Sequence, residues 1–342
     1  MAYELIDITD RALWDDFIAT HPEANFLQSY SFGEFHLAMG WPIVRRAVTE
    51  NGKIIAAYTG YVEPARRGRH LAIPGGPICD FGKKKLVQLL VDDMAQQGKR
   101  LRCVFVRIRP QELESAKTTK QLKTLKLVKA PLYLSVEHAG VLDLSKSEDE
   151  VLAGMRQRLR RALRKAEKAN ITIETTTDPQ QIKKFYEIEL ATAGRHGFVP
   201  FSEKFLREQF TAFADNNEAK LYIAKHEGQI LAENFMIFYG NEASYHYGVS
   251  TELGTRLSGA PLLHMQAMRD ARTLGIKRYN LWGIVDEDDT KHRFYGVSTF
   301  KRGFGVDELK YTPAHDLVLK PAYYWGLTYP FETLRRHLRR VN

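Results

Sequence analysis

The feature that most constrains the fold is one pattern that occurs twice, at a spacing of about half the chain. Residues 47–57 read as a strand, a tight Asn-Gly turn and a second strand, and residues 222–232 read in the same way. The turn glycines Gly52 and Gly228 are 176 residues apart (228 minus 52) in a chain of 342 residues. A tandem duplication produces such a spacing. We therefore expect two similar domains.

The second half shows what each domain resembles. Behind its hairpin we expect a strand at 243–250, a loop at 251–259, a helix that begins at Pro261 and a strand at 279–283. Hairpin, strand, helix and strand follow one another in this order in the acetyltransferase-like fold. The prediction is an α/β (α+β) protein with two tandem acetyltransferase-like domains, each a mixed sheet flanked by helices.

A strongly basic segment separates the two halves. Residues 149–170 read as one helix, with Arg160 and Arg164 on one basic face. Its apolar positions recur at three- and four-residue spacing: Leu152, Met155, Leu159, Leu163 and Ala166. We predict domains at 1–148 and 171–342, joined by this helix. The crowded positive charge favours a phosphate backbone or a diphosphate as ligand, and a solvated face that links the domains explains it equally well.

Composition narrows the class of partner. The net charge is +9, which suggests nucleic acid, a phosphorylated small molecule or an anionic membrane, although an excess charge also aids solubility. The only cysteines, Cys79 and Cys103, fit neither a metal site nor a disulfide framework. We find no apolar run of about eighteen residues and no signal segment, and so expect a cytoplasmic protein.

The loop at residues 256–261 bears on the acyl donor. Acetyltransferases usually carry a Gln/Arg-x-x-Gly-x-Gly/Ala loop, whose backbone amides hold the pyrophosphate of coenzyme A at a helix N-terminus. Here Gly259 fits, but Pro261 takes the last small-residue position and removes an amide donor. This disfavours coenzyme A and favours another activated acyl donor, so we expect no cofactor.

Four segments in order resemble the Fem family, the non-ribosomal peptidyltransferases of peptidoglycan bridge synthesis. Residues 155–166 are similar to the family's basic helix, and residues 26–33 to its Phe-Leu-Gln-Ser-x-x-Trp-Gly segment. Residues 76–78 resemble its Arg-Gly-Pro-Val. Residues 300–305, preceded by 279–283, resemble its C-terminal signature. No sustained heptad pattern is present, so the chain resembles the compact members without a coiled-coil arm.

The resemblance implies an aminoacyltransferase that uses aminoacyl-tRNA. The acceptor is an amine on the stem peptide of a peptidoglycan precursor, either lipid II or UDP-MurNAc-pentapeptide. Because the aminoacyl ester is already activated, aminolysis needs alignment of two substrates and stabilisation of an oxyanion, with no covalent enzyme intermediate.

Two residues are the candidates for catalysis. Lys301 is a compact cation beside a glycine-bounded turn, and the resemblance assigns it to carbonyl stabilisation. Tyr247, on the strand before the loop at 251–259, could hydrogen-bond substrate or relay a proton, although a half-buried aromatic residue in a strand explains it equally well. Candidate substrate-binding residues are Phe300, Arg302, His36, Arg195, Arg160 and Arg164.

Departures from the family pattern concern the acceptor. In the family an acidic residue often precedes the proline after the Arg-x-x-Pro strand. Here Arg109 precedes Pro110, so that carboxylate is missing. A member of the family contacts the diphosphate of its nucleotide-linked precursor through a lysine and an arginine. In this chain the corresponding positions hold His36 and Phe201. A lipid-linked acceptor is therefore favoured. Three nearby residues could substitute for the missing cations: Arg195, His196 and Lys204.

The C-terminal segment, residues 330–342, is expected to form a basic amphipathic helix. Its apolar residues are Phe331, Leu334, Leu338 and Val341, and four arginines lie largely on the other side: Arg335, Arg336, Arg339 and Arg340. Two explanations remain open: an interfacial helix on an anionic inner leaflet, or a helix docked on the protein through this apolar stripe.

Two other functions stay open at this stage. One is a coenzyme A-dependent N-acyltransferase on the same fold, against which Pro261 counts. The other is a non-catalytic RNA- or membrane-binding relative, which the missing carboxylate favours and the signature at 300–305 opposes.

Overall fold

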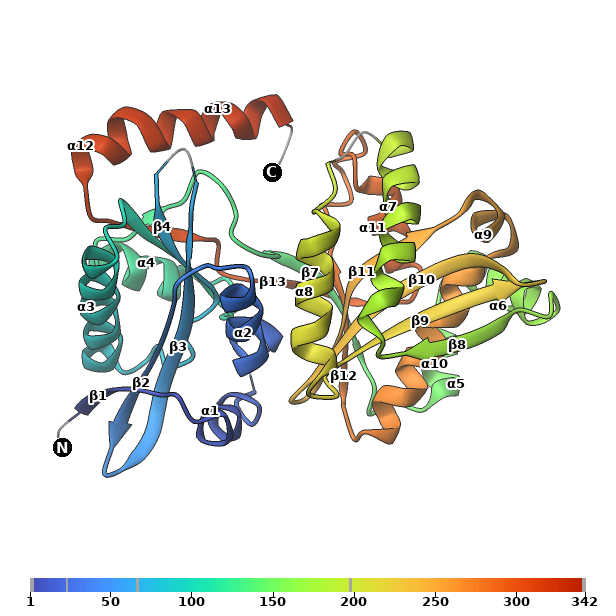
Figure 1. Cartoon of the computed structure of the whole chain (residues 1–342), viewed down its shortest axis with the longest axis horizontal. Helices are drawn as coiled ribbons and strands as arrows, with labels where there is room; N and C mark the ends of the chain where they lie inside the picture. Colours follow the sequence, from blue (N-terminus) through green and yellow to red (C-terminus); the bar gives the residue numbers. More distant parts are fainter. Residues whose placement is uncertain (1–2, 23, 66–67, 197–198, 340–342) are drawn as a thin grey trace. The chain divides into compact units, whose positions relative to one another are not determined.

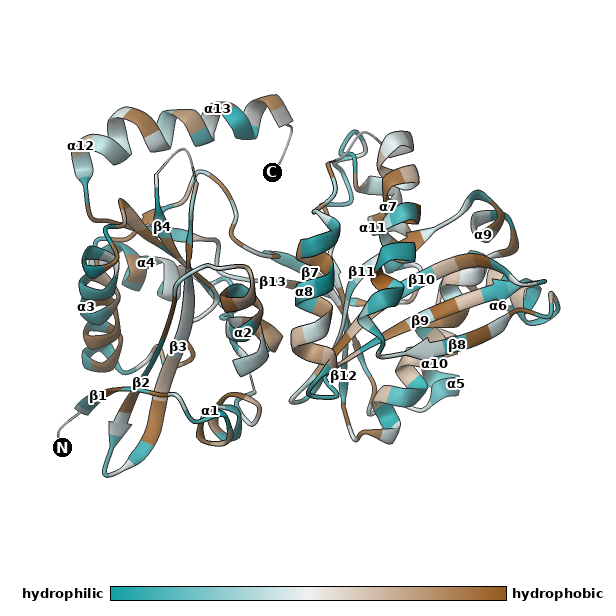
Figure 2. Ribbon diagram, in the orientation of Figure 1, coloured by the Kyte–Doolittle hydropathy of each residue, from teal (hydrophilic) through white to brown (hydrophobic). Residues whose placement is uncertain are grey.

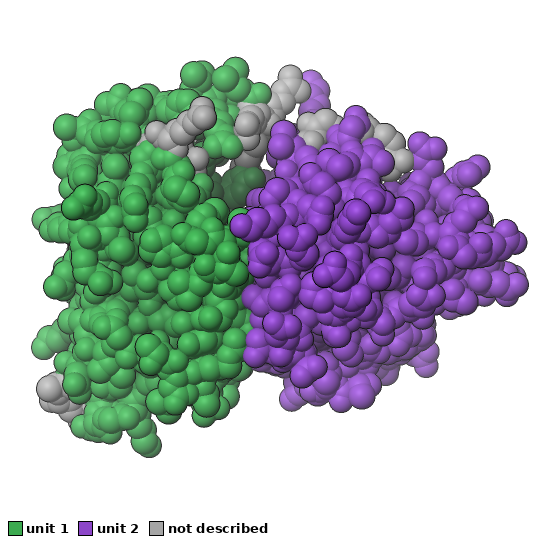
Figure 3. All heavy atoms as spheres, viewed as in Figure 1, with its two compact units in different colours: residues 1–137, 310–342 green, residues 138–309 purple. Residues whose placement is uncertain are grey.

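The computed structural model describes residues 3–22, 24–65, 68–196 and 199–339. The chain forms two compact units, which Figure 3 shows in different colours. Unit 1 comprises Met1–Glu137 and Lys310–Asn342, and unit 2 comprises His138–Leu309.

Unit 1 contains, in its described part, a seven-stranded sheet in the order β1-β2-β3-β4-β5-β14-β6. The strands are β1 (Tyr3–Asp7), β2 (Ile43–Glu50), β3 (Lys53–Glu63), β4 (His70–Gly75), β5 (Phe105–Pro110), β6 (Val128–Lys129) and β14 (His315–Val318). Neighbouring strands are antiparallel, except that β4 and β5 run parallel along the whole length of both. The helical segments are α1 (Arg11–Ile18), η1 (Phe26–Gln28), α2 (Tyr30–Ala38), α3 (Lys84–Arg100), α4 (Ala116–Thr124), α12 (Pro321–Tyr323), η3 (Tyr324–Thr328) and α13 (Tyr329–Arg339).

Local sequence signals account for these helices. At the start of α1, the Asp10 side chain accepts hydrogen bonds from the N–H groups of Ala12 and Leu13, and so caps the helix. In α3, residues Leu86, Val87, Leu90, Val91 and Met94 are buried against the sheet, as the spacing of an amphipathic helix requires. Figure 1 shows α3 and α2 on opposite sides of this sheet.

Unit 2 contains, in its described part, a second seven-stranded sheet in the order β13-β7-β12-β11-β10-β9-β8. The strands are β7 (His138–Asp143), β8 (Thr172–Thr176), β9 (Ala219–His226), β10 (Gln229–Tyr239), β11 (Glu242–Ser250), β12 (Arg278–Gly283) and β13 (Asp307–Lys310). The helical segments are α5 (Glu148–Gly154), α6 (Gln157–Glu167), η2 (Pro179–Gln181), α7 (Ile182–His196), α8 (Glu203–Ala214), α9 (Glu252–Leu257), α10 (Gly259–Thr273) and α11 (Tyr295–Arg302). Helices α7 and α8 cover one face of the sheet, and α10 with α6 covers the other (Figure 1).

The predicted duplication and fold class are confirmed. Read from β8, the sheet of unit 2 repeats the order of unit 1 strand by strand, and in both sheets the fourth and fifth strands are the parallel pair. Both hairpin turns have two residues with positive φ: Asn51 (52°) with Gly52 (75°), and Glu227 (47°) with Gly228 (77°). These values belong to a type I′ turn, which matches the twist of an antiparallel hairpin.

The basic segment at 149–170 is not the single helix that the sequence predicts. It is broken between α5 and α6, where Met155 and Arg156 are extended. The N–H of Arg156 donates to the carbonyl of Gly303 over 2.8 Å, and a Cβ added to Gly305 would collide with the backbone of Gly154. The glycines of the C-terminal signature therefore hold the break open.

The units also differ from the predicted domains 1–148 and 171–342. Strand β7 belongs to unit 2 because it pairs with β12, and α5 and α6 pack within unit 2. The chain after residue 309 returns to unit 1 because β14 pairs with β5. Hydrogen bonds between strands far apart in sequence set these boundaries, and no local pattern records them.

The predicted loop at 251–259 is partly helical. Helix α9 occupies Glu252–Leu257, and Ser258, with φ +64°, connects it to α10. Helix α10 begins at Gly259, so Pro261 is its third residue, where the missing N–H leaves no intrahelical hydrogen bond unmade. None of the described helices is both long and apolar enough to span a bilayer.

Candidate active site

The candidate site lies in unit 2, where β11 and β12 stop pairing. Their parallel pairing ends at Ser244 and Asn280, although both strands continue. A buried carboxylate joins them at this point: Glu242 accepts hydrogen bonds from the Ser244 hydroxyl over 2.7 Å and from the Asn280 amide over 3.1 Å, and its other oxygen forms an ion pair with Arg278 at 2.8 Å. The side chains of Glu242, Ser244 and Asn280 are all 1% exposed. The two strands are therefore fixed together just before they separate.

A β-bulge on β11 sorts its aromatic side chains between the two faces of the sheet. Tyr247 pairs with Phe235 and Tyr245 pairs with Met236, so His246 is the extra residue. Residues two apart in a strand normally share a face, but the bulge places Tyr245 and Tyr247 on opposite faces. The Tyr245 ring lies 4.5 Å from the ring of His264 in α10, centre to centre.

Lys301 lies on the same face as Tyr245. It is in the last turn of α11, its side chain is 7% exposed, and its Nζ is 5.5 Å from the centre of the Tyr245 ring. Nζ donates to the carbonyl of Gly283 over 2.8 Å. Burial lowers the pKa of Lys301 from 10.5 to about 7. The structure therefore places this lysine in a buried helical position, whereas the sequence suggests a turn.

A kink in β12 presents the Gly283 carbonyl. Trp282 has φ +66°, a left-handed conformation that costs a non-glycine residue on the order of 1 kcal/mol. Its N–H donates to the side-chain oxygen of Asn280 over 2.8 Å, which stabilises the kink. The register with β7 is irregular over the same stretch, between Asn280 and Gly283. Backbone strain of this kind often occurs at functional sites.

The remaining wall around Lys301 is formed by His264 and its neighbours. His264 is fully buried, and its Nδ1 lies 2.8 Å from the hydroxyl of Tyr279. Burial, and then the nearby Lys301 charge, lower the pKa of His264 to about 3, so the imidazole is neutral. Burial also raises the pKa of Tyr245 well above its usual value. The described groups around this ammonium are thus uncharged.

Tyr247, the second predicted catalytic residue, is not brought together with Lys301. Its ring lies 5.9 Å from that of Phe201 and 5.7 Å from that of Phe235. Phe201 is half exposed and stacks on Phe205 at 4.5 Å. Tyr247 therefore belongs to an aromatic patch at the start of α8, formed with Phe201 and Phe205.

The other residues of the C-terminal signature support the structure around Lys301. The guanidinium of Arg302 donates to both oxygens of Glu308 over 2.6 and 3.0 Å, and to the carbonyl of Val285 over 2.6 Å. Phe300 packs on His264 and on Phe304, with ring centres 5.7 and 5.3 Å apart. Arg302 and Phe300 thus fix α11, and their proposed contact with substrate remains a prediction.

The predicted basic and nucleotide-binding residues fall in separate places. Arg160 is partly exposed and Arg164 is exposed on α6. His36 is 2% exposed in unit 1, where it stacks on Tyr61 at 3.7 Å; burial lowers its pKa to about 3. The side chain of Arg195 lies outside the described residues, as does that of His196.

Arg109, which occupies the position of the family's acidic residue, is a buried structural residue. Its guanidinium donates to the Ser135 hydroxyl over 2.6 Å, to the Gln111 side chain over 2.5 Å and to the carbonyl of Pro110 over 3.3 Å. It also lies over the ring of Tyr311. This residue therefore supplies no base.

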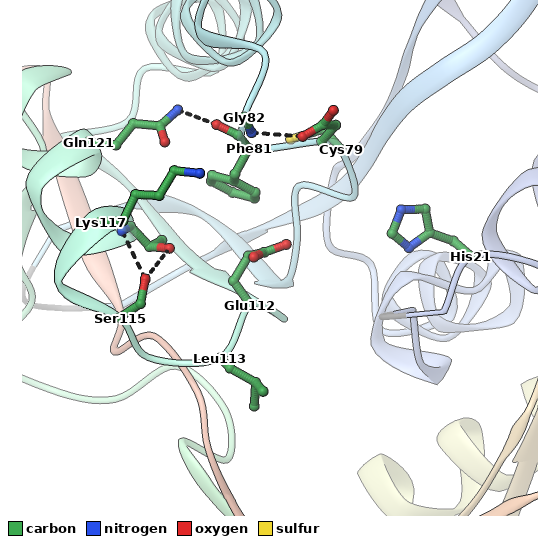
Figure 4. A pocket seen from close by; sticks show the side chains of 11 residues that line it. His21, Cys79, Phe81, Gly82, Glu112, Leu113, Ser115, Lys117 and Gln121 are labelled. Atoms are coloured by element: carbon green, nitrogen blue, oxygen red, sulfur yellow. Dashed lines mark hydrogen bonds between the residues drawn. The ribbon is translucent and has the colours of Figure 1, made fainter.

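Unit 1 has a pocket of about 470 Å³ between the end of β5 and the start of α4. Its acidic lining residues are Asp80 and Glu112, its basic one is Lys117, and Figure 4 shows His21 across from Glu112 and Lys117. Cys79 also lines it, and burial raises the pKa of its thiol well above the usual value. A pocket with both charges suits a ligand that carries an ammonium and a carboxylate.

Comparisons with known proteins agree with this architecture. Residues 9–141 match the model of the FemAB family, and residues 153–302 match the acetyltransferase (GNAT) domain. The lipid II:glycine glycyltransferase of Staphylococcus aureus (strain USA300) is 22% identical over 91% of this chain and 92% of its own length. The crystal structure of FemX superposes with a TM-score of 0.84 at 20% identity, over 95% of this chain and all of that chain. A tandem GNAT protein from the clavulanic acid biosynthesis pathway superposes with a TM-score of 0.57 at 13% identity, over 93% and 99% of the two chains.

The fold and the matched segments define a tandem acetyltransferase-fold enzyme. Its first part matches the FemAB family, and the chain is similar over nearly its whole length to an aminoacyltransferase, the lipid II:glycine glycyltransferase. The chain is of the compact type, since only residues 197–202 connect α7 to α8 and leave no length for a coiled-coil arm.

The sequence did not single out Tyr245, His264 or Gly248. A Cβ added to Gly248 would collide with the hydroxyl of Tyr245, so the glycine makes room for this side chain. The only sequence signal for Tyr245 is its place in Tyr245-His246-Tyr247, and strand alternation cannot separate the two tyrosines without knowledge of the bulge.

Proposed function

We propose that this enzyme transfers an amino acid from aminoacyl-tRNA to an amine on the stem peptide of a peptidoglycan precursor, with the lipid-linked precursor as the acceptor. The observation that carries the proposal is the buried ammonium of Lys301, held by the Gly283 carbonyl where β11 and β12 stop pairing. A cation fixed among uncharged groups is suited to a reaction that develops negative charge on oxygen.

The reaction is aminolysis of an ester. The acceptor nitrogen attacks the aminoacyl carbonyl carbon and forms the new amide bond, and the carbonyl oxygen becomes an oxyanion. The bond between that carbon and the ribose oxygen then breaks; the amine loses a proton, and the ribose hydroxyl gains one. In this proposal Lys301 stabilises the oxyanion, whose charge favours the protonated form of the lysine.

Tyr245 and His264 are proposed to position Lys301. The Tyr245 ring contacts the ammonium, and the His264 imidazole, at pKa about 3, adds no competing positive charge. For Tyr247 we propose a substrate-binding role in place of proton transfer, because its neighbours are Phe201 and Phe235. A partly exposed aromatic patch suits a nucleobase, such as the terminal adenine of the tRNA.

The basic face of α6 is proposed to contact the tRNA backbone. Its exposed cations are Arg158, Arg161, Arg164, Lys165 and Lys168, with Arg160 partly exposed, while Leu159, Leu163 and Ala166 are buried. Regularly spaced cations on a packed helix bind phosphates without reading sequence.

The pocket of unit 1 is proposed to hold part of the stem peptide. Lys117 would pair with a peptide carboxylate and Glu112 with an ammonium group of the peptide. This pairing requires that the pocket binds the acceptor and not the tRNA.

A lipid-linked acceptor is favoured over the nucleotide-linked precursor by the state of His36. A neutral imidazole that is 2% exposed is a poor diphosphate ligand, and Phe201 offers no charge at the second position. The Staphylococcus aureus relative also carries lipid II in its name. We accordingly place the enzyme in the cytoplasm, in peripheral contact with the inner face of the membrane.

To test this, the enzyme is incubated with charged tRNA and either lipid-linked or nucleotide-linked muropeptide. Mass spectrometry then measures the mass of the precursor. We expect a gain of one aminoacyl unit on the lipid-linked precursor, loss of this product for Lys301→Ala, and an unchanged yield for the exposed control Lys291→Ala. A thermal shift with acyl-coenzyme A, together with no product from charged tRNA, would support the coenzyme A-dependent alternative instead.

A further inference from the structure

The C-terminal segment is docked on unit 1 by polar side chains. Arg107 of β5 donates two hydrogen bonds of 2.7 Å to Asp316 of β14, and a third of 2.7 Å to Glu332 of α13. The Tyr324 hydroxyl donates to the same Asp316 over 2.6 Å. All four side chains are at most 2% exposed. A buried guanidinium with two carboxylates is costly to break, because any one loss leaves an unpaired charge.

This polar attachment fixes which side of the segment faces outward. The buried positions Tyr324, Thr328 and Glu332 recur every four residues. Six large apolar side chains of this segment are exposed: Tyr323, Trp325, Leu327, Phe331, Leu334 and Leu338. All but Trp325 recur at three- and four-residue spacing and so lie on one side of the helix, which we call the apolar face. The helix is therefore docked, but not through the stripe of Phe331, Leu334 and Leu338 on which the docked explanation rests.

The apolar face is too extended for a surface in contact with water alone. Phe331 is 51% exposed, Leu334 is 57% and Leu338 is 74% exposed, and they follow one another at helical spacing. Single exposed apolar residues are common, but a contiguous row marks a contact surface. Figure 2 shows brown, hydrophobic bands along α13.

The charge of the segment indicates what covers this face. Residues 317–342 contain five lysines and arginines and one acidic residue, a net charge of +4 (5 minus 1) in the sequence. The acidic residue is Glu332, whose charge is buried against Arg107. Trp325 and Tyr323 add the aromatic rings that favour the interface of a bilayer. Apolar side chains with cations and interfacial aromatics fit an anionic membrane, whereas a nucleic acid would leave the apolar residues unused.

We infer that the apolar face of η3 and α13 inserts into the headgroup region of an anionic membrane, and that the Arg107–Asp316–Glu332 network holds it in the orientation for insertion. The inference rests on the proposed function for its purpose, since a lipid-linked acceptor lies at the membrane. Membrane binding itself is independent of the proposed function, because it needs neither tRNA nor precursor.

The test is flotation of the full chain with vesicles of phosphatidylglycerol and phosphatidylcholine that contain no precursor. We expect the wild type to float with the vesicles. Leu334→Ser/Leu338→Ser should lower the vesicle affinity about tenfold or more, because two apolar side chains leave the interface. The control Leu274→Ser, in unit 2 and 58% exposed, should bind as the wild type does.

Two further arms separate the competing occupants. Pure phosphatidylcholine vesicles, or high salt, should weaken binding because the cations contribute to it, and equal binding under all conditions would contradict an anionic membrane as the partner. In analytical ultracentrifugation, the wild-type protein should sediment as a monomer at the assay concentration. Absence of binding to anionic vesicles would overturn the inference, as would a dimer that the Leu334→Ser/Leu338→Ser substitution dissolves.

The same variant separates this inference from the proposed function. With a water-soluble acceptor analogue, Leu334→Ser/Leu338→Ser should transfer at the wild-type rate. If the wild type floats but transfers nothing to any acceptor, the proposed function fails while the membrane surface stands. If it transfers but does not float, the membrane surface fails alone.

Discussion

Replacing Lys301 by methionine should abolish transfer and yet stabilise the protein. Burial lowers the pKa of Lys301 from 10.5 to about 7, so the folded state binds fewer protons than the unfolded state between these values. At about 1.4 kcal/mol per pKa unit, burying this lysine costs about 5 kcal/mol at pH 6 and about 2 kcal/mol at pH 9. Methionine fills a similar volume and does not titrate, although it loses the hydrogen bond to Gly283, worth about 1 kcal/mol at either pH.

The assay is urea unfolding of both proteins at pH 6 and pH 9. The advantage of Lys301→Met should shrink by about 3 kcal/mol from the lower to the higher pH, and this difference does not depend on how methionine packs. A stability difference between the two proteins that is independent of pH would refute a buried lysine with a lowered pKa. Retained transfer would remove Lys301 from the reaction.

Other contacts of the site, the basic helix and the pocket can be tested by substitution. Gly248→Ala should lower kcat about tenfold or more, because the new methyl group displaces the Tyr245 hydroxyl. The control Gly296→Ala, whose methyl group meets no atom within 4 Å, should leave kcat unchanged. Equal kcat values for the two variants would contradict the positioning role of Tyr245. Arg161→Glu/Arg164→Glu should weaken tRNA binding and flatten its dependence on salt, as a filter-binding titration would show; an unchanged slope would place the tRNA elsewhere. Glu112→Gln should raise KM for the acceptor without changing KM for aminoacyl-tRNA, and the opposite pattern would assign the pocket to the tRNA. The value of kcat/KM should fall as pH rises through about 7, because Lys301 loses its proton; a rise continuing to pH 9 would show that the neutral amine is the active form.

The fold was largely predictable from the sequence because local signals specified it. The turn pairs Asn51-Gly52 and Glu227-Gly228 require positive φ at both residues, and their spacing revealed the duplication. The boundaries were not predictable, because β7 and β14 join their sheets by pairing with strands more than a hundred residues away. The break between α5 and α6 was not predictable for the same reason, because the N–H of Arg156 donates its hydrogen bond to the distant carbonyl of Gly303.

The site was predictable only in part. The family resemblance led to Lys301, and the structure adds the burial that changes its pKa. Tyr247 was a candidate because of its place on the strand before the loop at 251–259, but one bulged residue, His246, puts Tyr245 and not Tyr247 on the face of Lys301. In the C-terminal helix the sequence pattern located the apolar stripe, but the docking side is set by Glu332, whose partner Arg107 lies 225 residues away.

The proposed mechanism requires a positive charge on residue 301 during ester aminolysis. The measurement is the single-turnover rate of transfer from a fixed complex with charged tRNA and lipid-linked precursor, for Lys301→Met and Lys291→Met. We predict a loss of about a hundredfold or more for the first and no loss for the second, as is typical when an oxyanion-stabilising group is removed. A Lys301→Met enzyme that transfers within threefold of the wild-type rate would contradict this mechanism.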